Sequence, residues 1–389
     1  MSDSYPSRRS ILGAVAAAAA TPLLAGVPAA EAAGPSGRAA RRDDLVFVSP
    51  WKGTQIYGAR FDARSGTLTS LGPVGDASSN WTTAHPARPL LYVGSSEDGG
   101  IVHTYAIDRA SGRLTRTGTS IHTDDGGTAG GGISYLAVDE PSHTLLVANF
   151  EVGLAASLPL SKGMPGRPVS VAQDSGSGPN PRQNGPHVHH VTIDWSGRHA
   201  LVADFGADRV FNHGFDRSTG VITPGAGAYA TAPGSGPRRV LFHPRRRTAY
   251  VLNELSGDLE TLDWDRGTLH PRQRLMLDTD GYTGTKSGAE LALSRDARFV
   301  YASSRGEHTL VVFAVDERSG LLRLVQRVPS GGMKPWSFSL HRSGDWLLAA
   351  NQASNTVTVF AVDRRSGTLT AVGAPVAFPA PACLTFFDR

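Results

Sequence analysis

The residues best suited to chemistry are an arginine pair, a set of histidines and an isolated glutamate. Arg238 and Arg239 are adjacent, and His187 and His189 are two positions apart. Glu254 ends a run of strand-forming residues. Arginine makes paired hydrogen bonds to carboxylates and phosphates, and histidine can accept a proton near neutral pH. Together these residue types indicate an electropositive site for a small anionic molecule.

These residues can act together only if the fold gathers them, and six copies of one short phrase indicate that fold. Each copy consists of Asp, a short and mostly polar stretch, Gly, one further residue and an aliphatic residue. An aspartate side chain and a glycine with positive φ are what a tight hairpin turn requires. The copies begin at Asp62, Asp108, Asp216, Asp265, Asp316 and Asp363.

A second pattern of strand, polar turn and strand lies between these copies. The resulting units of four short strands recur roughly every fifty residues, which is the period of a propeller blade. After the first thirty residues we find no convincing amphipathic helix. The sequence therefore predicts an all-β, seven-bladed β-propeller. Its units begin near Leu45, Asn80, Ile133, His187, Pro237, Gly288 and Pro335.

The last strand of the chain has no partner in its own unit. Residues 383–387 read as an inner strand, whereas the unit that begins near Leu45 has only its later strands. Pairing the two closes the ring and leaves no open sheet edge. We therefore expect residues 45–389 to form one propeller whose C-terminal strand completes the first blade.

The first 32 residues read as an export signal. Arg8 and Arg9 precede an Ala-rich apolar run and a cluster of small residues around Ala30, as in a twin-arginine signal peptide. Residues 33–44 are then a flexible linker. An uncleaved membrane anchor is the alternative, but the apolar run is short and alanine is weakly hydrophobic. We expect an exported protein without stable membrane insertion.

Composition and spacing limit the partners. The net charge of +4 is spread over all blades, and the basic run at 245–247 falls in a turn without interleaved aromatics, so we expect no nucleic acid. The single Cys383 cannot form an intramolecular disulfide. Strand alternation sends His190 away from His189, and no carboxylate lies at ligand spacing, so we expect no metal. We also expect a monomer without cofactor.

Propeller geometry predicts where the site lies. The first strands of the blades begin, and the second strands end, around the same opening of the central channel. We call this opening the mouth. The polar residues at these positions are candidates to surround one small lactone or carboxylate. In addition to the residues above, the candidate substrate-binding residues are His187, Asn149, Asp204, Asn253, Glu290, Trp336 and Asn351.

Several of these segments resemble one family, that of bacterial 6-phosphogluconolactonases and fungal 3-carboxymuconate cycloisomerases, which are seven-bladed propellers. The resemblance extends from Leu45 onward. The segments GPRRVLFHP at 236–244 and YVLNE at 250–254 are similar to the family signature. Further similar blocks occupy residues 186–189, 203–208, 299–306 and 348–352.

The resemblance implies roles for particular residues. Arg239 stands where the family often has histidine, and Trp336 stands where it commonly has arginine. These departures weaken the case for phosphate recognition. The family's proposed functional set is a histidine, two arginines and a glutamate. By motif, this set corresponds here to His189, Arg238, Arg305 and Glu254.

The resemblance implies hydrolysis of the ring ester of a small, anionic lactone of the sugar-acid or carboxylated type. His189 would accept a proton from water, one arginine would bind the charged group, and the other would stabilise the oxyanion. A cycloisomerase acting on a muconate-like carboxylate could use the same groups. A non-catalytic binding propeller would use none. In that case Arg238 and Arg305 would form ion pairs across blades with Glu254 or Glu290.

Export is testable without knowledge of the activity. Replacing Arg8 and Arg9 together by Lys should leave the protein in the cytoplasm, because the twin-arginine pathway reads the arginine pair rather than positive charge in general. Cell fractionation followed by immunoblotting measures the distribution. Unchanged secretion of the double variant would refute the prediction.

Overall fold

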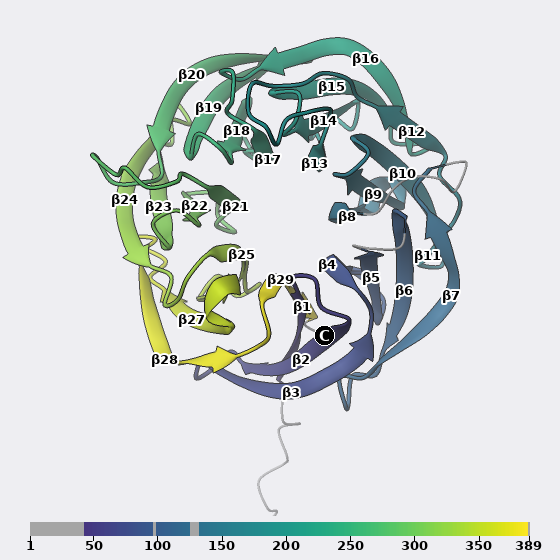
Figure 1. Ribbon diagram of the computed structural model, residues 1–389, viewed down its shortest axis with the longest axis vertical. Coiled ribbons are helices and arrows are strands. Elements are labelled where there is room, and N and C mark those ends of the chain that lie inside the picture. Colours follow the sequence, from purple (N-terminus) through teal and green to yellow (C-terminus); the bar gives the residue numbers. More distant parts are fainter. Residues whose placement is uncertain (1–42, 96–98, 125–131, 388–389) are drawn as a thin grey trace, which may run out of the picture. The chain divides into compact units, whose positions relative to one another are not determined.

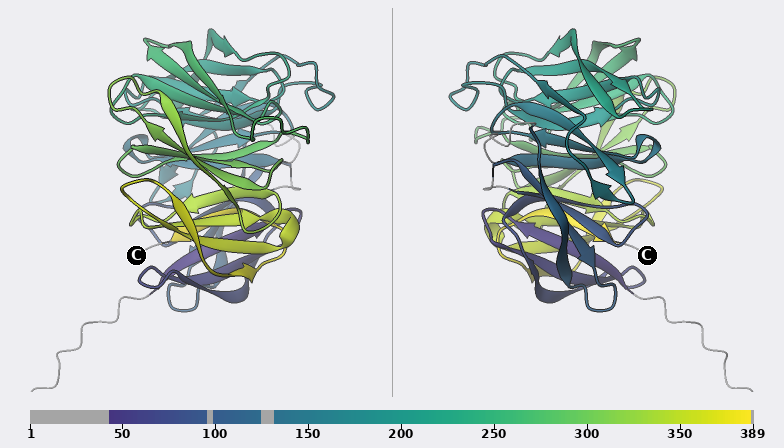
Figure 2. Two further views of the ribbon diagram at one scale, coloured as in Figure 1. Left: turned by 90° about the vertical axis from the view of Figure 1, so that its left-hand side faces the viewer. Right: turned by 90° about the vertical axis from the view of Figure 1, so that its right-hand side faces the viewer.

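The computed structural model describes residues 43–95, 99–124 and 132–387, and most of these residues lie in strands and turns. The predicted signal peptide and most of the predicted linker lie outside the described residues. Seven antiparallel sheets surround a central axis (Figure 1). Each sheet contributes turns to both faces of the propeller (Figure 2). The predicted all-β, seven-bladed propeller is confirmed.

Six blades run in chain order from an inner strand beside the axis to an outer strand at the rim. The inner strands are β4 (Ser79–Ala84), β8 (Ile133–Asp139), β13 (Val188–Ile193), β17 (Pro237–Phe242), β21 (Gly288–Leu293) and β25 (Pro335–Leu340). The second strands are β5 (Leu90–Ser95), β9 (Thr144–Asn149), β14 (His199–Asp204), β18 (Thr248–Asn253), β22 (Phe299–Ser304) and β26 (Trp346–Asn351).

The outer halves of these blades continue the same order. The third strands are β6 (Ile101–Ile107), β10 (Leu154–Ser161), β15 (Arg209–Asp216), β19 (Asp258–Asp265), β23 (Thr309–Val315) and β27 (Thr356–Val362). The outer strands are β7 (Leu114–His122), the pair β11 (Met164–Pro165) and β12 (Ser170–Gln173), β16 (Val221–Ala230), β20 (Thr268–Met276), β24 (Leu322–Pro329) and β28 (Leu369–Ala377). Among the described residues, the helical elements are two short 3-10 turns, Glu140–Ser142 and Gln352–Ser354.

The remaining blade, the first in chain order, joins the two ends of the described chain. It has the order β29 (Pro381–Phe387), β1 (Asp44–Pro50), β2 (Gln55–Asp62) and β3 (Thr67–Asp76). β29 pairs antiparallel with β1 and lies beside the inner strands β4 and β25 (Figure 1). The C-terminal strand is therefore the inner strand of the first blade, as predicted, and every inner strand has an inner strand on each side.

The apolar core is divided among the blade interfaces. Each of the seven buried clusters in the described residues combines side chains from two neighbouring blades. One cluster, for example, joins Tyr250 and Leu252 of one blade to Val300 and Phe313 of the next. Alternating strand residues supply these side chains, because successive residues point to opposite faces of a sheet. A blade thus buries both faces only when both neighbours are present.

The repeated Asp and Gly form the predicted turns between third and outer strands. In the turn at Asp316, the carboxylate accepts hydrogen bonds from the backbone N–H groups of Arg318 and Ser319. Gly320 has a φ of 73° and donates its N–H to the Asp316 carbonyl. The Gly320 carbonyl in turn accepts a hydrogen bond of 2.9 Å from Tyr250 in the preceding blade. The turns therefore also connect blades.

Removal of residues 381–389 should destabilise the whole propeller. The deletion removes β29 and leaves β1 without its inner partner. It also exposes apolar side chains whose burial contributes several kcal/mol to the free energy of unfolding. We expect aggregation or a fall in melting temperature on the order of 10 °C. Differential scanning calorimetry measures this, with removal of residues 388–389 alone as the control. A soluble truncation that melts like the parent would contradict this mode of closure.

Candidate functional site

A cavity of about 190 Å³ lies at the mouth, and it gathers five of the predicted residues. His189 comes from β13, Arg238 from β17 and Trp336 from β25. Glu254 and Arg305 directly follow β18 and β22. The predicted convergence of histidine, arginines and glutamate at the mouth is therefore present in the structure. The cavity is smaller than the roughly 300–1,000 Å³ of sites for drug-sized ligands, so it suits a small molecule.

A shift of register near the start of the inner strand turns three of these side chains, His189, Arg238 and Trp336, out of the regular pairing. In β13 the pairing with β14 passes from Val188 to His190 and omits His189. In β17 and β25 the same shift omits Arg238 and Trp336. Such bulges occur next to active sites because they redirect a side chain away from the regular ladder. The pairings of β4 and β8 likewise omit Asn80 and Ser134, which also line the cavity.

Glu254 holds the arginines of the site together. Its Oε1 is 2.8 Å from Arg182 Nη2, and its Oε2 is 2.8 Å from both Arg238 Nη1 and Arg305 Nη2. Glu254 is only 2% exposed. Burial opposes its ionisation, but the three guanidinium groups outweigh burial and lower the pKa of Glu254 to about 2. The carboxylate is therefore ionised at neutral pH and fully occupied by arginine.

His189 is a neutral imidazole beside two arginines. A guanidinium can only donate, and Arg238 Nη1 donates to His189 Nε2, so this nitrogen carries a lone pair. Arg239 Nη1 lies 3.2 Å from the His189 carbonyl oxygen. Burial, followed by the charges of Arg238, Arg239 and Arg305, lowers the pKa of His189 well below 6.5. The site thus contains an uncharged proton acceptor at neutral pH.

Adjacent Arg238 and Arg239 serve different parts of the structure. Burial lowers the pKa of Arg238 to about 9, so its guanidinium remains charged at neutral pH. Arg239 pairs with Glu290 at 2.8 Å across the blade interface and stacks against Trp81, with 4.5 Å from its guanidinium carbon to the ring centre. This second pair lies beside the cavity residues rather than among them. Glu290 is therefore placed as a partner of Arg239.

Four predicted binding residues lie at second-strand ends but do not line the cavity. Their side chains are buried against their own neighbourhoods. Asn253 Nδ2 donates to Asp258 and Glu260. Asn351 Nδ2 donates to Thr358 at 3.0 Å. Roles in substrate binding stay a prediction for these residues, which are Asn149, Asp204, Asn253 and Asn351.

Asp204 and His187 illustrate why these positions are polar. Asp204 Oδ1 accepts hydrogen bonds from the backbone N–H groups of His187, Gly206 and Ala207, and burial raises the pKa of Asp204 to about 6. His187 stacks on Phe150 with ring centres 4.6 Å apart and does not line the cavity. The polar groups here satisfy backbone donors where a strand ends and a loop begins.

Arg182 and three aromatic side chains line the cavity without having been predicted. Arg182 lies in the polar loop that follows β12, and its reach to Glu254 places that loop at the mouth. Trp51, Trp81 and Phe150 form much of the remaining wall. Aromatic side chains combined with a few well-placed polar groups are typical of small-molecule sites. The sequence shows this loop to be long and polar, but it does not indicate which of its residues reaches the cavity.

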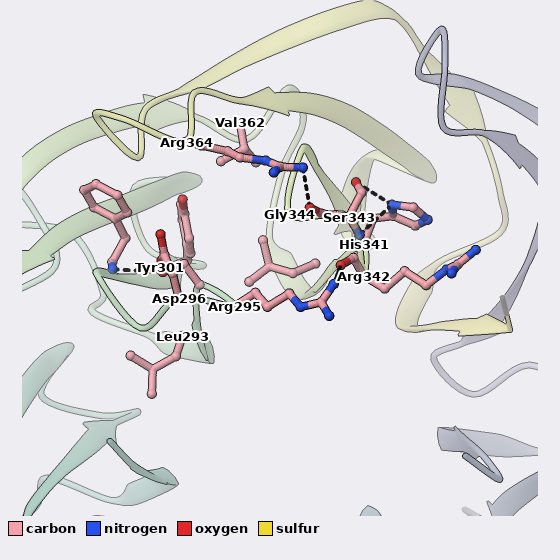
Figure 3. Close-up of a pocket in the computed structure, with 13 residues that line it drawn as sticks. Leu293, Arg295, Asp296, Tyr301, His341, Arg342, Ser343, Gly344, Val362 and Arg364 are labelled. Atoms are coloured by element: carbon pink, nitrogen blue, oxygen red, sulfur yellow. Dashed lines mark hydrogen bonds between the residues drawn. The ribbon is translucent and has the colours of Figure 1, made fainter. Parts of the chain in front are cut away.

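A larger cavity of about 700 Å³ lies between the blade of β21–β24 and the blade of β25–β28, at the ends of their inner strands away from the mouth (Figure 3). Its arginines are engaged with the protein. Arg295 Nη1 donates to the Arg342 carbonyl, and Arg364 pairs with Asp345 (Figure 3 labels three of these residues). The imidazole of this cavity, His341, has both ring nitrogens engaged, with Asp44 and Ser343. Because its histidine and these arginines are already bonded to the protein in this way, whereas at the mouth a histidine, three arginines and a glutamate converge, we assign the chemistry to the mouth.

Two further findings concern the part of the chain that the structure describes. No group of three or more His, Cys, Asp or Glu side chains there has a geometry suited to a metal ion. No helix there is long and apolar enough to cross a membrane.

Comparison with known proteins agrees with this architecture. Residues 46–386 match the family described as lactonase, 7-bladed beta-propeller. The chain belongs to this family. A relative from Bacillus subtilis, named 6-phosphogluconolactonase, is 31% identical over 304 residues, which cover 77% of this chain and 84% of the relative. Membership of the lactonase family confirms the resemblance inferred from the sequence.

Solved structures resemble the lactonase-family propeller over most of its length. A periplasmic gluconolactonase from Pseudomonas aeruginosa has a TM-score of 0.80 and 30% identity, covering 88% of this chain and 98% of its own. A putative 6-phosphogluconolactonase from Bacteroides fragilis has a TM-score of 0.79 and 27% identity, covering 91% and 100%. The seven-bladed ring is thus shared throughout.

Because three arginines share the Glu254 carboxylate, we expect its removal to have a large effect on stability. Glu254→Gln should lower the free energy of unfolding by about 3–5 kcal/mol, because it leaves two buried guanidinium groups without their anion. Urea denaturation measures the change. Glu151→Gln is the matched control, since Glu151 also lines the cavity but is exposed. Equal effects of the two substitutions would contradict the structural role of Glu254.

Proposed function

We propose that the protein hydrolyses the ring ester of a small, anionic lactone of the sugar-acid or carboxylated type, and that it does so after export. The observation that carries this proposal is a neutral imidazole in contact with a guanidinium cluster inside a small cavity. The names of the relatives support lactone hydrolysis in general. The twin-arginine pattern at Arg8 and Arg9 supports export.

The arginines supply binding and transition-state stabilisation. A substrate carboxylate can accept paired hydrogen bonds from one guanidinium, and the lactone carbonyl oxygen can accept from another. Arg238 and Arg305 both reach the Glu254 carboxylate, so their guanidinium groups lie close enough to act on one small ring. Donors placed at the carbonyl oxygen stabilise the oxyanion that forms there.

His189 supplies the proton acceptor. In the free protein, an N–H group of Arg238 donates to His189 Nε2. When a substrate oxygen accepts this hydrogen bond instead, His189 Nε2 becomes free to bind water. The water oxygen attacks the carbonyl carbon as Nε2 accepts a water proton. The bond between the carbonyl carbon and the ring oxygen then breaks, and the ring oxygen takes the proton from the imidazolium. The product is an open-chain hydroxy acid, which ionises to a carboxylate at neutral pH.

Glu254 is poorly suited to the role of base. Its pKa of about 2 means that the carboxylate stays ionised at neutral pH and is a weak proton acceptor. Both of its oxygens are also occupied by arginines. Glu254 therefore acts as the anchor of the guanidinium groups, and His189 is left as the proton acceptor.

Replacement of His189 tests the proposal. His189→Gln keeps an acceptor for Arg238 but removes a base, so kcat should fall about 10²–10⁴-fold with a small change in KM. The assay is hydrolysis of a panel of gluconolactones and muconolactones, corrected for the rate in buffer. His187→Gln is the matched control, because His187 lies outside the cavity. No hydrolysis above buffer by the parent protein would sink the proposal.

The pH profile gives a second test. A base must be neutral to act, and the pKa of His189 is lowered well below 6.5 by burial and the neighbouring arginines. Activity should therefore persist from neutral pH to below pH 6.5 and be lost as the pH falls through the lowered pKa. Measurement of kcat/KM across this range checks the sign. An acid limb above pH 6.5 would exclude His189 as the titrating base.

A further inference from the structure

Two tryptophans form one side of the cavity, and the steps above use neither. Trp51 follows β1, and Trp336 occupies the bulge position of β25. Both line the cavity, and their ring centres are 4.5 Å apart with an angle of 39° between the ring planes. We call this pair the aromatic wall. Each of the two side chains is only partly buried.

Both members of the aromatic wall are fixed in place. The Arg305 guanidinium carbon lies 4.4 Å from the centre of the Trp336 ring, which is a cation–π contact. The Trp51 backbone N–H donates to the Ala380 carbonyl at 2.7 Å, immediately before β29 begins. The wall is therefore supported both by the arginine cluster and by the strand that closes the ring.

Its position suits a ring-shaped ligand. Large aromatic side chains that stay partly exposed beside convergent polar groups are characteristic of ligand sites, since they offer apolar area at low entropic cost. The cavity has arginines on one side for oxygen atoms and indole on another for carbon atoms. A small saturated ring with polar substituents and a C–H face has both kinds of surface.

We propose that the Trp51–Trp336 pair is the wall against which the lactone ring packs, and that Trp336 holds Arg305 in position for the substrate's oxygens. The inference rests on the proposed function for the chemical class of the ligand. It assigns Trp336 two effects, apolar contact with the ring and placement of a charged donor.

The charged side chains that line the cavity limit the net charge of the substrate that can bind there. Arg182, Arg238 and Arg305 face Glu151 and Glu254, which leaves one excess positive charge among the titratable side chains lining the cavity, with His189 neutral. One carboxylate balances this excess. A phosphate monoester carries nearly two negative charges at pH 7. The site should therefore prefer a lactone with one free carboxylate, such as a muconolactone, to a lactone with a phosphate monoester.

Intrinsic fluorescence tests the wall without reference to turnover. Freshly dissolved glucono-1,5-lactone, and gluconate, are titrated into the full-length protein carrying His189→Gln, which should remove the enzymatic hydrolysis and leave only the rate in buffer. We expect a saturable change in tryptophan emission that is lost when Trp51 and Trp336 are both replaced by Phe. Trp195→Phe is the matched control, because Trp195 is an exposed indole at the other end of β13. Trp81 also lines the cavity and can contribute a small remaining change. A signal of undiminished size after the double replacement would overturn the proposal.

Kinetics separates contact from placement. Trp336→Ala should lower kcat/KM for gluconolactone about 10–200-fold, as loss of a pocket contact does. A fall in kcat beyond the rise in KM indicates a misplaced Arg305. Trp336→Phe should recover most of the activity, because it keeps an aromatic face for the guanidinium. Equal activity of the Ala and parent proteins would contradict both effects, and thermal melting verifies that each variant is folded.

The outcomes distinguish the inference from the proposed function. Saturable quenching by the lactone without hydrolysis by the parent protein would overturn the lactonase activity and leave the wall in place. Hydrolysis without any fluorescence change would do the reverse. A parent protein that prefers 6-phosphogluconolactone to a lactone with one free carboxylate, such as a muconolactone, would overturn the charge argument.

Discussion

A four-stranded blade can bury its two faces only against its neighbours, and the rest of the structure depends on this constraint. The seven buried clusters of the described residues lie between blades, so stability belongs to the closed ring rather than to any one sheet. Closure by β29 in turn brings seven inner strands to one axis. Residues far apart in the chain, such as His189 and Trp336, reach one cavity for that reason.

Within this ring, local irregularity creates the site. The ladder positions of the inner strands are committed to pairing with the next strand, whereas a residue omitted at a register shift is released from that pairing. His189, Arg238 and Trp336 all occupy omitted positions. A propeller can therefore vary its chemistry at one residue per blade without disturbing its interfaces, provided that buried charges such as Arg238 find an anion, here Glu254.

The sequence was sufficient for the fold because each turn carries its own chemistry. Asp316 and Gly320 stand for a turn whose hydrogen bonds are local, so the spacing of such turns revealed the blades. The site was harder to predict. A polar residue at a strand end, such as Asn253, looks the same whether it faces a ligand or a neighbouring strand, and here it bonds to Asp258. Arg182 lies in a loop without periodicity, so nothing in the sequence located it against Glu254.

Burial lowers the pKa of both His189 and Arg238, but the two groups end in different protonation states at neutral pH. It lowers the pKa of His189 well below 6.5, which keeps the imidazole neutral in mildly acidic solution. It also lowers the pKa of Arg238, but only to about 9, because Glu254 opposes the effect. Between these limits the cavity contains an uncharged acceptor and a charged donor in contact. Glu254 thus supports chemistry by preserving the charge of Arg238, which burial alone would diminish.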